Sequence, residues 1–374
     1  MTLRTIPCTL MRGGTSKGVF FRKEFLPPPG KKRNDTLLKI FGSGDPMQLD
    51  GLGGAQVQSS KTMIVSKSER SGVDLDYLFG QVSVDGWFVD YAGNCGNLTS
   101  AIAPFGIDEG LLRVRGSKAL VRLYNVNTKK RVDATIPLEQ GKTKYDGNYM
   151  IDGVPRPGAR IDVTWHDPAG AMSGKLLPTG NVVDRISVNG KVVNCSIVDA
   201  GNPVAFVDAA EVGLEGAELP GQVSRGVLDL LEAVRSEAAC MMGLVDAPAD
   251  ATKMTPHMPF IAAVTASQDY VSSEGRKVTK KDYGVLARLF SMQKMHHAYA
   301  ATGAICTAVA SKVPGSVVNQ VSRDSGETVV IGHPKGLIDL QVRSRVSSES
   351  LEVGSVTLGR TARRLMSGVA YYTA

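Results

Sequence analysis

The chain has 374 residues and a formal net charge of +7, from 43 lysines and arginines against 36 aspartates and glutamates. Hydrophobic residues make up 43% of the sequence and charged residues 21%, which excludes a disordered or fibrous protein and predicts a sizeable core. The sequence has no run of about 18 apolar residues and its start is short and polar, so we expect neither a membrane span nor a signal peptide.

The positive charge favours partners such as phosphates, nucleic acid or small polyanions. The basic residues are dispersed, however, and the densest groups, Lys31–Arg33 and Lys129–Arg131, have no interleaved aromatic residues. We interpret each group as a solvated loop or hairpin tip and expect no nucleic-acid partner. The five scattered cysteines contain no CxxC pair, which indicates reduced thiols and a cytoplasmic protein rather than a disulfide framework or a zinc site.

Most of the chain is predicted to form short strands joined by turns. Asp85-Gly86 lies between two β-rich runs and predicts a hairpin with a two-residue turn. Asn189-Gly190 predicts a second hairpin of the same kind. The predicted strands cover residues 6–10, 19–22, 78–84, 87–91, 185–188 and 191–198.

Helices are fewer. Apolar residues at helical spacing predict a helix over 223–242, and a short helix is expected to end at Phe41 before a glycine. Thr279, with an acid three residues later, is typical of a helix start, and we predict a helix from there through Tyr299. Short helices rich in small residues are predicted over 95–105 and 302–313.

The sequence also contains a weak internal similarity, between residues 88–94 and 197–202, each of which follows a predicted hairpin. We interpret it as a sign of two related α+β halves. The expected domains are residues 1–180 and 181–374. Whether the last strand crosses back to the first domain stays open.

Met11-Arg12-Gly13-Gly14-Thr15-Ser16-Lys17-Gly18 combines three glycines, two hydroxyls and two cations. Such a segment can direct backbone N–H groups at an anion, although it does not match the P-loop pattern. A simple glycine-rich turn is the alternative. Thr302-Gly303, at the start of a predicted helix, is a second candidate anion site.

Cys95 lies between two Gly-Asn pairs, where a predicted strand meets the start of a helix. A helix start lowers the pKa of a thiol, so Cys95 is a candidate acid, base or nucleophile, although a lone cysteine is more often a small buried hydrophobe. Lys61 ends a polar, glycine-rich loop just before an apolar strand. A lysine base must be neutral, which requires burial or nearby cations, and Lys61 by itself is a weak candidate.

Read together, several segments resemble one family over nearly the whole chain, that of methylaconitate isomerase, 3-methylitaconate Δ-isomerase and 4-oxalomesaconate tautomerase. The segments that carry the resemblance are residues 11–18, 50–54, 60–61, 76–77, 93–97, 177–181, 332–334 and 360–364. The resemblance implies an α+β fold like that of diaminopimelate epimerase. Two similar domains, each a mixed sheet wrapped around a central helix, would enclose the active site in the cleft between them.

The epimerases use two opposed cysteines. Cys95-Gly96-Asn97 matches the first cysteine turn, whereas the second aligns with Ala300-Ala301-Thr302-Gly303, where alanine replaces the thiol. The resemblance therefore disfavours a two-thiol racemase. It gives Lys61 the role of a base that removes a proton next to a C=C bond. The proton would return from Lys61 itself if the shift is suprafacial, or from Cys95.

The resemblance further implies that no metal or organic cofactor takes part in the reaction. It allows a homodimer, and we expect no membrane partner. The substrate would be a small unsaturated polycarboxylate. The residues expected to bind it are Arg12, Gly13, Gly14, Thr15, Ser16, Ser60, Asn94, Gly96, Asn97, Thr179, Asn202, Thr302 and Gly303.

Several functions stay open at this point. The leading one is a 1,3-allylic proton shift in aconitate, methylaconitate, methylitaconate or oxalomesaconate. A cis/trans isomerisation of aconitate can use the same dienolate, and a one-base racemisation is a further enzymatic alternative. A non-catalytic accessory protein of an aconitase-like enzyme is the alternative from a different class.

Overall fold

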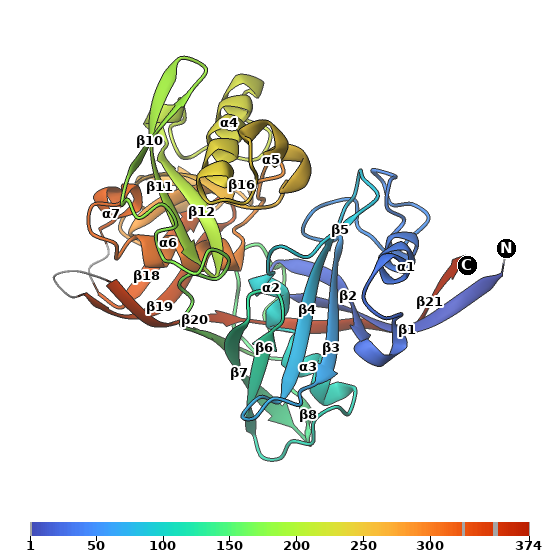
Figure 1. The fold of residues 1–374 in the computed structure, drawn as a ribbon. Coiled ribbons are helices and arrows are strands. Elements are labelled where there is room, and N and C mark those ends of the chain that lie inside the picture. The colour runs from blue at the N-terminus through green and yellow to red at the C-terminus, as the bar shows by residue number, and fades with distance from the viewer. Residues whose placement is uncertain (1, 324–325, 347–350, 374) are drawn as a thin grey trace. The chain divides into compact units, whose positions relative to one another are not determined.

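The computed structural model describes residues 2–323, 326–346 and 351–373, which fold into two compact units (Figure 1). Unit 1 consists of Met1–Thr164 together with Gly359–Ala374. Unit 2 consists of Trp165–Leu358. The final strand therefore belongs to the same unit as the first one.

Unit 1 is built on one mixed sheet. Its strands follow the order β21-β1-β2-β3-β4-β6-β7, and the pairs β2–β3 and β4–β6 are parallel while the others are antiparallel. The short β5 pairs with the end of β4, and β8 with the end of β7. The strands are β1 (Leu3–Gly13), β2 (Ser16–Arg22), β3 (Lys61–Lys67), β4 (Leu75–Val82), β5 (Val89–Asp90), β6 (Lys118–Asn125), β7 (Lys130–Glu139), β8 (Lys142–Thr143), β9 (Ile161–His166) and β21 (Ala362–Thr373).

The helices of unit 1 lie on opposite faces of this sheet. On the inner face, α2 (Gly96–Thr99) contacts β1 and β2, and α3 (Ile102–Asp108) contacts β3, β4 and β7. The sheet is thus wrapped around these two short helices, as Figure 1 shows. On the outer face, the apolar side of α1 (Lys31–Phe41) packs with residues of β1, β2 and β3 in a separate core cluster.

Unit 2 has a corresponding mixed sheet around α6 (Ala301–Ala310). All ten residues of α6 are buried, and the helix contacts β11, β12, β18 and β19. A small two-stranded sheet, β14 (Tyr270–Val271) with β15 (Lys277–Val278), is separate. The other strands are β10 (Asp184–Val188), β11 (Lys191–Ala200), β12 (Asn202–Asp208), β13 (Phe260–Ala266), β16 (Val285–Ser291), β17 (Lys294–Met295), β18 (Thr328–His333), β19 (Gly336–Val346) and β20 (Leu351–Arg360).

The two units repeat one topology. In unit 2, β11, β12, β13, β16, β18 and β19 pair in the same order and with the same directions as β1, β2, β3, β4, β6 and β7 in unit 1. The expected α+β fold, with two similar units each wrapped around a central helix, is confirmed. The internal similarity was misaligned, because residues 88–94 lead into α2, whereas residues 197–202 form the β11–β12 hairpin.

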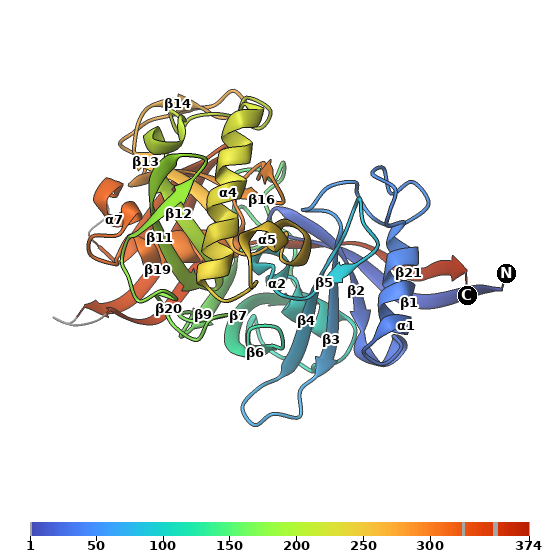
Figure 2. The same cartoon turned by 45° about the horizontal axis from the view of Figure 1, so that its top comes forward.

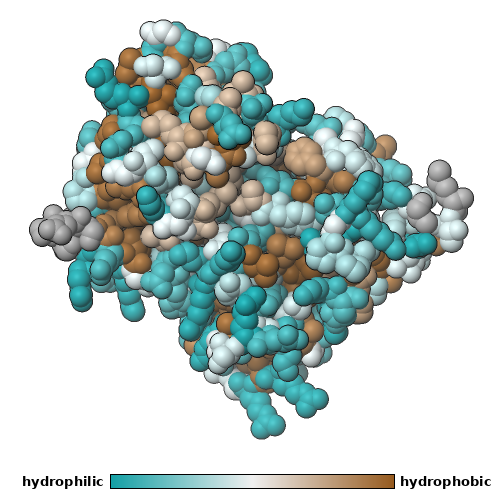
Figure 3. Space-filling view, in the orientation of Figure 1, coloured by the Kyte–Doolittle hydropathy of each residue, from teal (hydrophilic) through white to brown (hydrophobic). Residues whose placement is uncertain are grey.

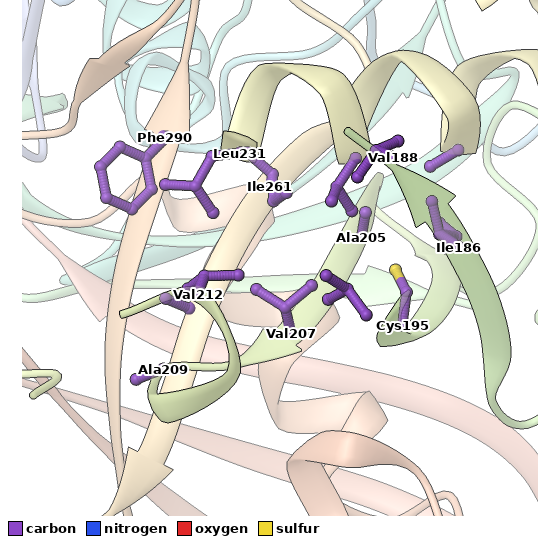
Figure 4. Packing of buried hydrophobic residues seen from close by; sticks show 14 of the residues in the cluster. Ile186, Val188, Cys195, Ala205, Val207, Ala209, Val212, Leu231, Ile261 and Phe290 are labelled. Atoms are coloured by element: carbon purple, nitrogen blue, oxygen red, sulfur yellow. The ribbon is translucent and has the colours of Figure 1, made fainter. Parts of the chain in front are cut away.

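The largest helix, α4 (Arg225–Met241), covers the outer face of the unit 2 sheet together with α5 (Pro248–Met254), as Figure 2 shows. Leu231 of this helix belongs to the same buried cluster as Val207 and Ile261 of the strands beneath it (Figure 4). The hydroxyl of Ser224 caps the helix by accepting a hydrogen bond from the Val227 N–H. The predicted helix over 223–242 is therefore confirmed. The remaining helical segments are α7 (Val317–Val321), η1 (Lys23–Phe25) and η2 (Ala210–Val212).

The predicted helix from Thr279 through Tyr299 is wrong, because this segment forms β16 and β17. Thr279 does make the expected cap-like hydrogen bond with Asp282, but this bond closes a turn and no helix follows. All seven residues of β16 are buried. A fully buried strand and a buried helix both have uninterrupted apolar runs, which hydrophobic periodicity cannot distinguish.

Of the two predicted hairpin turns, only Asn189-Gly190 is confirmed as a two-residue turn, with both residues at positive φ. The hairpin around Asp85-Gly86 exists, but its last paired residues are Val82 and Val89, so the connection is longer than predicted. Within it, the Ser83 hydroxyl accepts a hydrogen bond from the Gly86 N–H. This side-chain contact replaces the tight turn.

Hydrophilic side chains cover much of the face seen in Figure 3, with smaller hydrophobic groups between them. Lys31 and Arg131 are exposed and pair with Asp35 and Asp133. The loop predicted at Lys31–Arg33 is wrong, because these residues begin α1, and Arg33 is buried. In the part of the chain that the structure describes, no helix has the length and apolar character needed to cross a membrane.

The turn between β1 and β2 packs tightly against α2. Gly14 has φ +49°, and a Cβ at this position would lie 2.2 Å from Oδ1 of Asn97. A Cβ on Gly13 would lie 2.6 Å from the Asn97 carbonyl oxygen. Glycine is required here both for the backbone conformation and for the close approach of the helix.

We predict that Gly14→Ala lowers the free energy of unfolding by about 1–3 kcal/mol more than Gly72→Ala does. Gly72 also has a positive φ, +71°, but a Cβ there would meet no atom within 4 Å. The comparison therefore isolates the steric contact with Asn97 from the backbone strain. Urea denaturation followed by circular dichroism measures the difference, and equal losses would contradict this account of the turn.

Candidate functional site

Lys61 is the first residue of β3 and is buried on the inner face of the unit 1 sheet, with 6% of its surface exposed. Its Nζ donates a hydrogen bond to Oε1 of Gln81, at 2.5 Å. The ammonium position also lies 5.0 Å from the centre of the Phe79 ring. The backbone of β2 approaches closely because Gly18 has no side chain: a Cβ there would lie 2.6 Å from the Lys61 carbonyl oxygen.

Gln81 fixes the direction of this hydrogen bond. Its Nε2 donates to the carbonyl oxygens of Val57, at 3.1 Å, and Ser60, at 2.8 Å. Both amide hydrogens are therefore used, and Oε1 is held toward Lys61. The sequence gives no local signal for Gln81. It faces Lys61 because β3 and β4 pair with these two residues in register.

Burial lowers the pKa of Lys61, because removing the ammonium from water destabilises the charged form. Electrostatic interactions with Cys95 and Asp90 act in the opposite direction and raise the pKa of Lys61. A buried lysine with a lowered pKa can be neutral and act as a base at moderate pH. The structure thus supplies for Lys61 the condition that the sequence could not show.

Cys95 is the N-cap residue of α2 and is 8% exposed. Its thiol donates a hydrogen bond to Oγ of Ser16, at 3.7 Å, and Ser16 is the first residue of β2. Because Cys95 also acts electrostatically on Lys61, the structure brings Ser16, Lys61 and Cys95 into one cluster. We call this cluster, with Gln81, the lysine site.

Tyr77 supports the start of α2 from β4. Its phenolic oxygen accepts hydrogen bonds from Nδ2 of Asn125, at 3.0 Å, and from the Thr99 hydroxyl, at 3.3 Å, and it also bonds with Asn94. Burial raises the pKa of Tyr77 to about 12. The phenol is therefore neutral, and Asn94 belongs to the hydrogen-bond network that holds the residue before Cys95.

The glycine-rich turn contributes fewer free N–H groups than its sequence indicates. The Gly14 N–H donates to the Thr361 carbonyl oxygen, at 2.9 Å, and the Thr15 N–H donates to Oδ1 of Asn97, at 3.4 Å. Nη1 of Arg12 donates to the carbonyl oxygens of Gly14 and Thr361, both at 3.0 Å. These contacts hold the turn against α2 and against the start of β21.

Two predicted binding residues have further constraints. Strand alternation places Arg12 on the opposite face of the β1–β2 hairpin from Ser16. Burial, together with the charge of Arg363, lowers the pKa of Arg12 to about 10. The Ser60 hydroxyl donates to the Val82 carbonyl oxygen and accepts from Nε2 of Gln48, so it already has partners of both kinds.

Gly13, Gly96 and Asn97 lie where the turn meets the first residues of α2, close to Cys95. Four other predicted residues belong to unit 2. The Thr179 hydroxyl donates to Asp184, at 2.8 Å, and Nδ2 of Asn202 donates to the Thr302 hydroxyl at the start of α6, at 2.9 Å. A Cβ on Gly303 would lie 2.3 Å from Cδ1 of Leu289, so this glycine permits packing. That these residues bind substrate stays a prediction.

Unit 2 has no acid or base at the positions that correspond to Lys61 and Cys95. The N-cap residue of α6 is Ala300, where α2 has Cys95. Strand β13 begins at Phe260, where β3 begins at Lys61. Among the described residues, no group of three or more His, Cys, Asp or Glu side chains is arranged to hold a metal ion. The only lysine–cysteine pair at these positions is that of unit 1.

The chain that contains the lysine site is similar to several named isomerases. The chain is 42% identical to 3-methylitaconate isomerase of Eubacterium barkeri, over 98% of this chain and 97% of that one. It is 38% identical to 2-methyl-aconitate isomerase of Cupriavidus necator, over 97% and 96%. A crystal structure of methylitaconate-delta-isomerase matches with a TM-score of 0.80 and 40% identity, over 100% of this chain and 96% of that one.

A more distant structure extends the likeness in fold alone. A hydroxyproline epimerase of Agrobacterium vitis matches 99% of this chain and 92% of its own, with a TM-score of 0.58 and 10% identity. The expected diaminopimelate epimerase-like fold is consistent with both structures. The model of the family described as "PrpF protein" matches residues 3–373. The chain is therefore a member of the PrpF protein family and an isomerase.

Proposed function

We propose that this isomerase catalyses a 1,3-allylic proton shift in an unsaturated di- or tricarboxylic acid. The observation that carries the proposal is the buried Lys61 beside Cys95 in unit 1, with alanine and phenylalanine at the corresponding positions of unit 2. The names of the relatives indicate the substrate class, with methylitaconate and methylaconitate as the first candidates. Aconitate and oxalomesaconate belong to the same class.

In the first step, neutral Lys61 removes a proton from the saturated carbon next to the C=C bond. The electron pair of that C–H bond moves into a dienolate, conjugated with a substrate carboxylate, and Lys61 becomes an ammonium. Positive groups fixed near the developing charge stabilise such an intermediate. The hydrogen bond to Gln81 holds Nζ in one direction, which favours attack on one carbon.

In the second step, the far allylic carbon takes up a proton and the double bond moves by one position. We assign this step to the Cys95 thiol, whose S–H is held by Ser16 within the lysine site. The Lys61 ammonium then returns its proton to the Cys95 thiolate. One proton leaves the substrate and one is added, so the reaction balances without an oxidant, reductant or organic cofactor.

The remaining parts of the proposal concern binding and location. Ser16 and the first residues of α2 would hold one carboxylate of the substrate. The net charge of +7 suits a polycarboxylate substrate. All five cysteines are free thiols, which agrees with an enzyme that works in the reducing cytoplasm.

We predict that Lys61→Met lowers turnover at least about 100-fold, because no other residue of the lysine site is a strong base. The matched control is Lys67→Met, which removes an exposed lysine at the other end of the same strand. Proton NMR in heavy water, with a panel of methylitaconate, aconitate, methylaconitate and oxalomesaconate, measures both double-bond migration and the carbon that exchanges.

Each result of this panel has a distinct meaning. Migration by the parent protein and by Lys67→Met, but not by Lys61→Met, is the expected result. Exchange without migration would indicate racemisation, and a change from cis to trans aconitate would indicate geometric isomerisation. If the parent protein shifts no double bond in any of these acids, the proposal is wrong and an accessory role gains support.

Cys95→Ala should reduce turnover by about 10²–10⁴-fold, since the variant lacks the proton donor of the second step. Cys8→Ala serves as the control, because Cys8 is equally buried but packs with α1 on the outer face of the sheet. Steady-state rates with the substrate found above measure both variants. Turnover of Cys95→Ala within about tenfold of the parent would assign the second step to Lys61 instead.

A further inference from the structure

Asp90 lies in line with the lysine site, although no sequence motif marks it. Its strand, β5, pairs with β4 so that Asp90 is opposite Gln81, and Gln81 is in turn opposite Lys61 on β3. Residues directly opposite one another in a sheet have their side chains on the same face. Lys61, Gln81 and Asp90 therefore form one row across three strands on the inner face.

The Asp90 carboxylate is only half satisfied by the protein. Oδ1 accepts a hydrogen bond from the Ala92 N–H, at 2.7 Å. Oδ2 is buried and has no hydrogen-bond partner among the described residues. A buried charge without a partner is costly, so a carboxylate in this position needs a compensating charge nearby. Lys61 is the cation that acts on Asp90.

We propose that Asp90 is a positioning residue that supplies the counter-charge for the Lys61 ammonium. The role in turnover rests on the proposed function: when Lys61 takes the substrate proton, Asp90 stabilises the cation that forms. Asp90 acts through Lys61 and does not itself transfer a proton. The substrate dienolate and Asp90 are both negative, so each of them stabilises the ammonium form of Lys61.

The other charged groups around this row are few. Cys95, at the start of α2, is the second titratable group that acts on Lys61. Helix α1 packs against β5, and its Arg33 lies over the ring of Tyr91, 5.2 Å from the ring centre. Tyr91 in turn donates a hydrogen bond to Oδ1 of Asn34. These contacts place the charged Arg33 of α1 against Tyr91, which follows Asp90 in the sequence.

The electrostatic effects have the sign that the proposal requires. Burial lowers the pKa of Lys61, and the charge of Asp90 raises it. Burial raises the pKa of Asp90, while the Ala92 N–H and the charge of Lys61 lower it. Removal of the Asp90 charge should therefore let the pKa of Lys61 fall further. A base with a lower pKa becomes neutral at a lower pH but accepts a proton less strongly.

The test is Asp90→Asn, which removes the charge and keeps an oxygen that can accept from the Ala92 N–H. We expect the pKa of Lys61 to fall by about one unit. The acidic limb of kcat/KM should move to lower pH by the same amount, and turnover on the plateau should fall, by no more than about tenfold, because the base is weaker. NMR of protein carrying ¹³C-labelled lysine measures the titration, and Lys61→Met assigns the signal.

Asp85→Asn is the matched control, because Asp85 is exposed in the loop that joins β4 to β5. Its Lys61 titration and its pH profile should equal those of the parent protein. A merely structural role of Asp90 would change stability and rate without moving the Lys61 titration. An unmoved titration in folded Asp90→Asn therefore overturns the proposal.

Two further arms keep the test decisive. If the parent protein converts no candidate acid, the proposed function fails, but the titration of Lys61 still decides whether Asp90 is its counter-charge. If Asp90→Asn does not fold, the reciprocal measurement applies: in Lys61→Met, the Asp90 carboxyl should titrate at a higher pH than in the parent protein. An unchanged Asp90 titration by carboxyl ¹³C NMR would then overturn the proposal.

Discussion

The burial of one amine, that of Lys61, is the constraint on which the account of this protein depends. An ammonium is destabilised when it leaves water, and the protein holds this one with a hydrogen bond to Gln81 and an aromatic ring at 5.0 Å. These contacts keep the side chain in place while its pKa stays below the ordinary value. The same burial that makes the charged form costly makes the neutral form a usable base.

Much of unit 1 serves to make this burial possible. Gly18 lets β2 approach the backbone of Lys61, and Gly14 lets the β1–β2 turn approach α2. That approach brings Cys95 to Ser16, beside Lys61. The glycine-rich segment thus acts mainly through close packing, since the N–H groups of Gly14 and Thr15 already have acceptors within the protein.

The sequence predicted the parts that depend on local chemistry. The Asn189-Gly190 turn and helix α4 form as expected, because turn residues and an apolar stripe act over short distances. The helix predicted over 279–299 failed, because a fully buried strand has no alternation. Lys61 and Cys95 could be selected as candidates, but Gln81 and Asp90 could not, because only the register of β3, β4 and β5 brings them together.

The central claim is that one unit supplies both proton-transfer groups, so one proton should be removed and another added on the same face of the substrate. The direct measurement uses a substrate in which deuterium replaces one of the two allylic hydrogens. The carbon that takes up the new proton must become stereogenic in the product. We predict a suprafacial course, in which the hydrogen removed and the hydrogen added lie on one face of the allylic system. An antarafacial course would require a second group on the opposite side and would contradict the account.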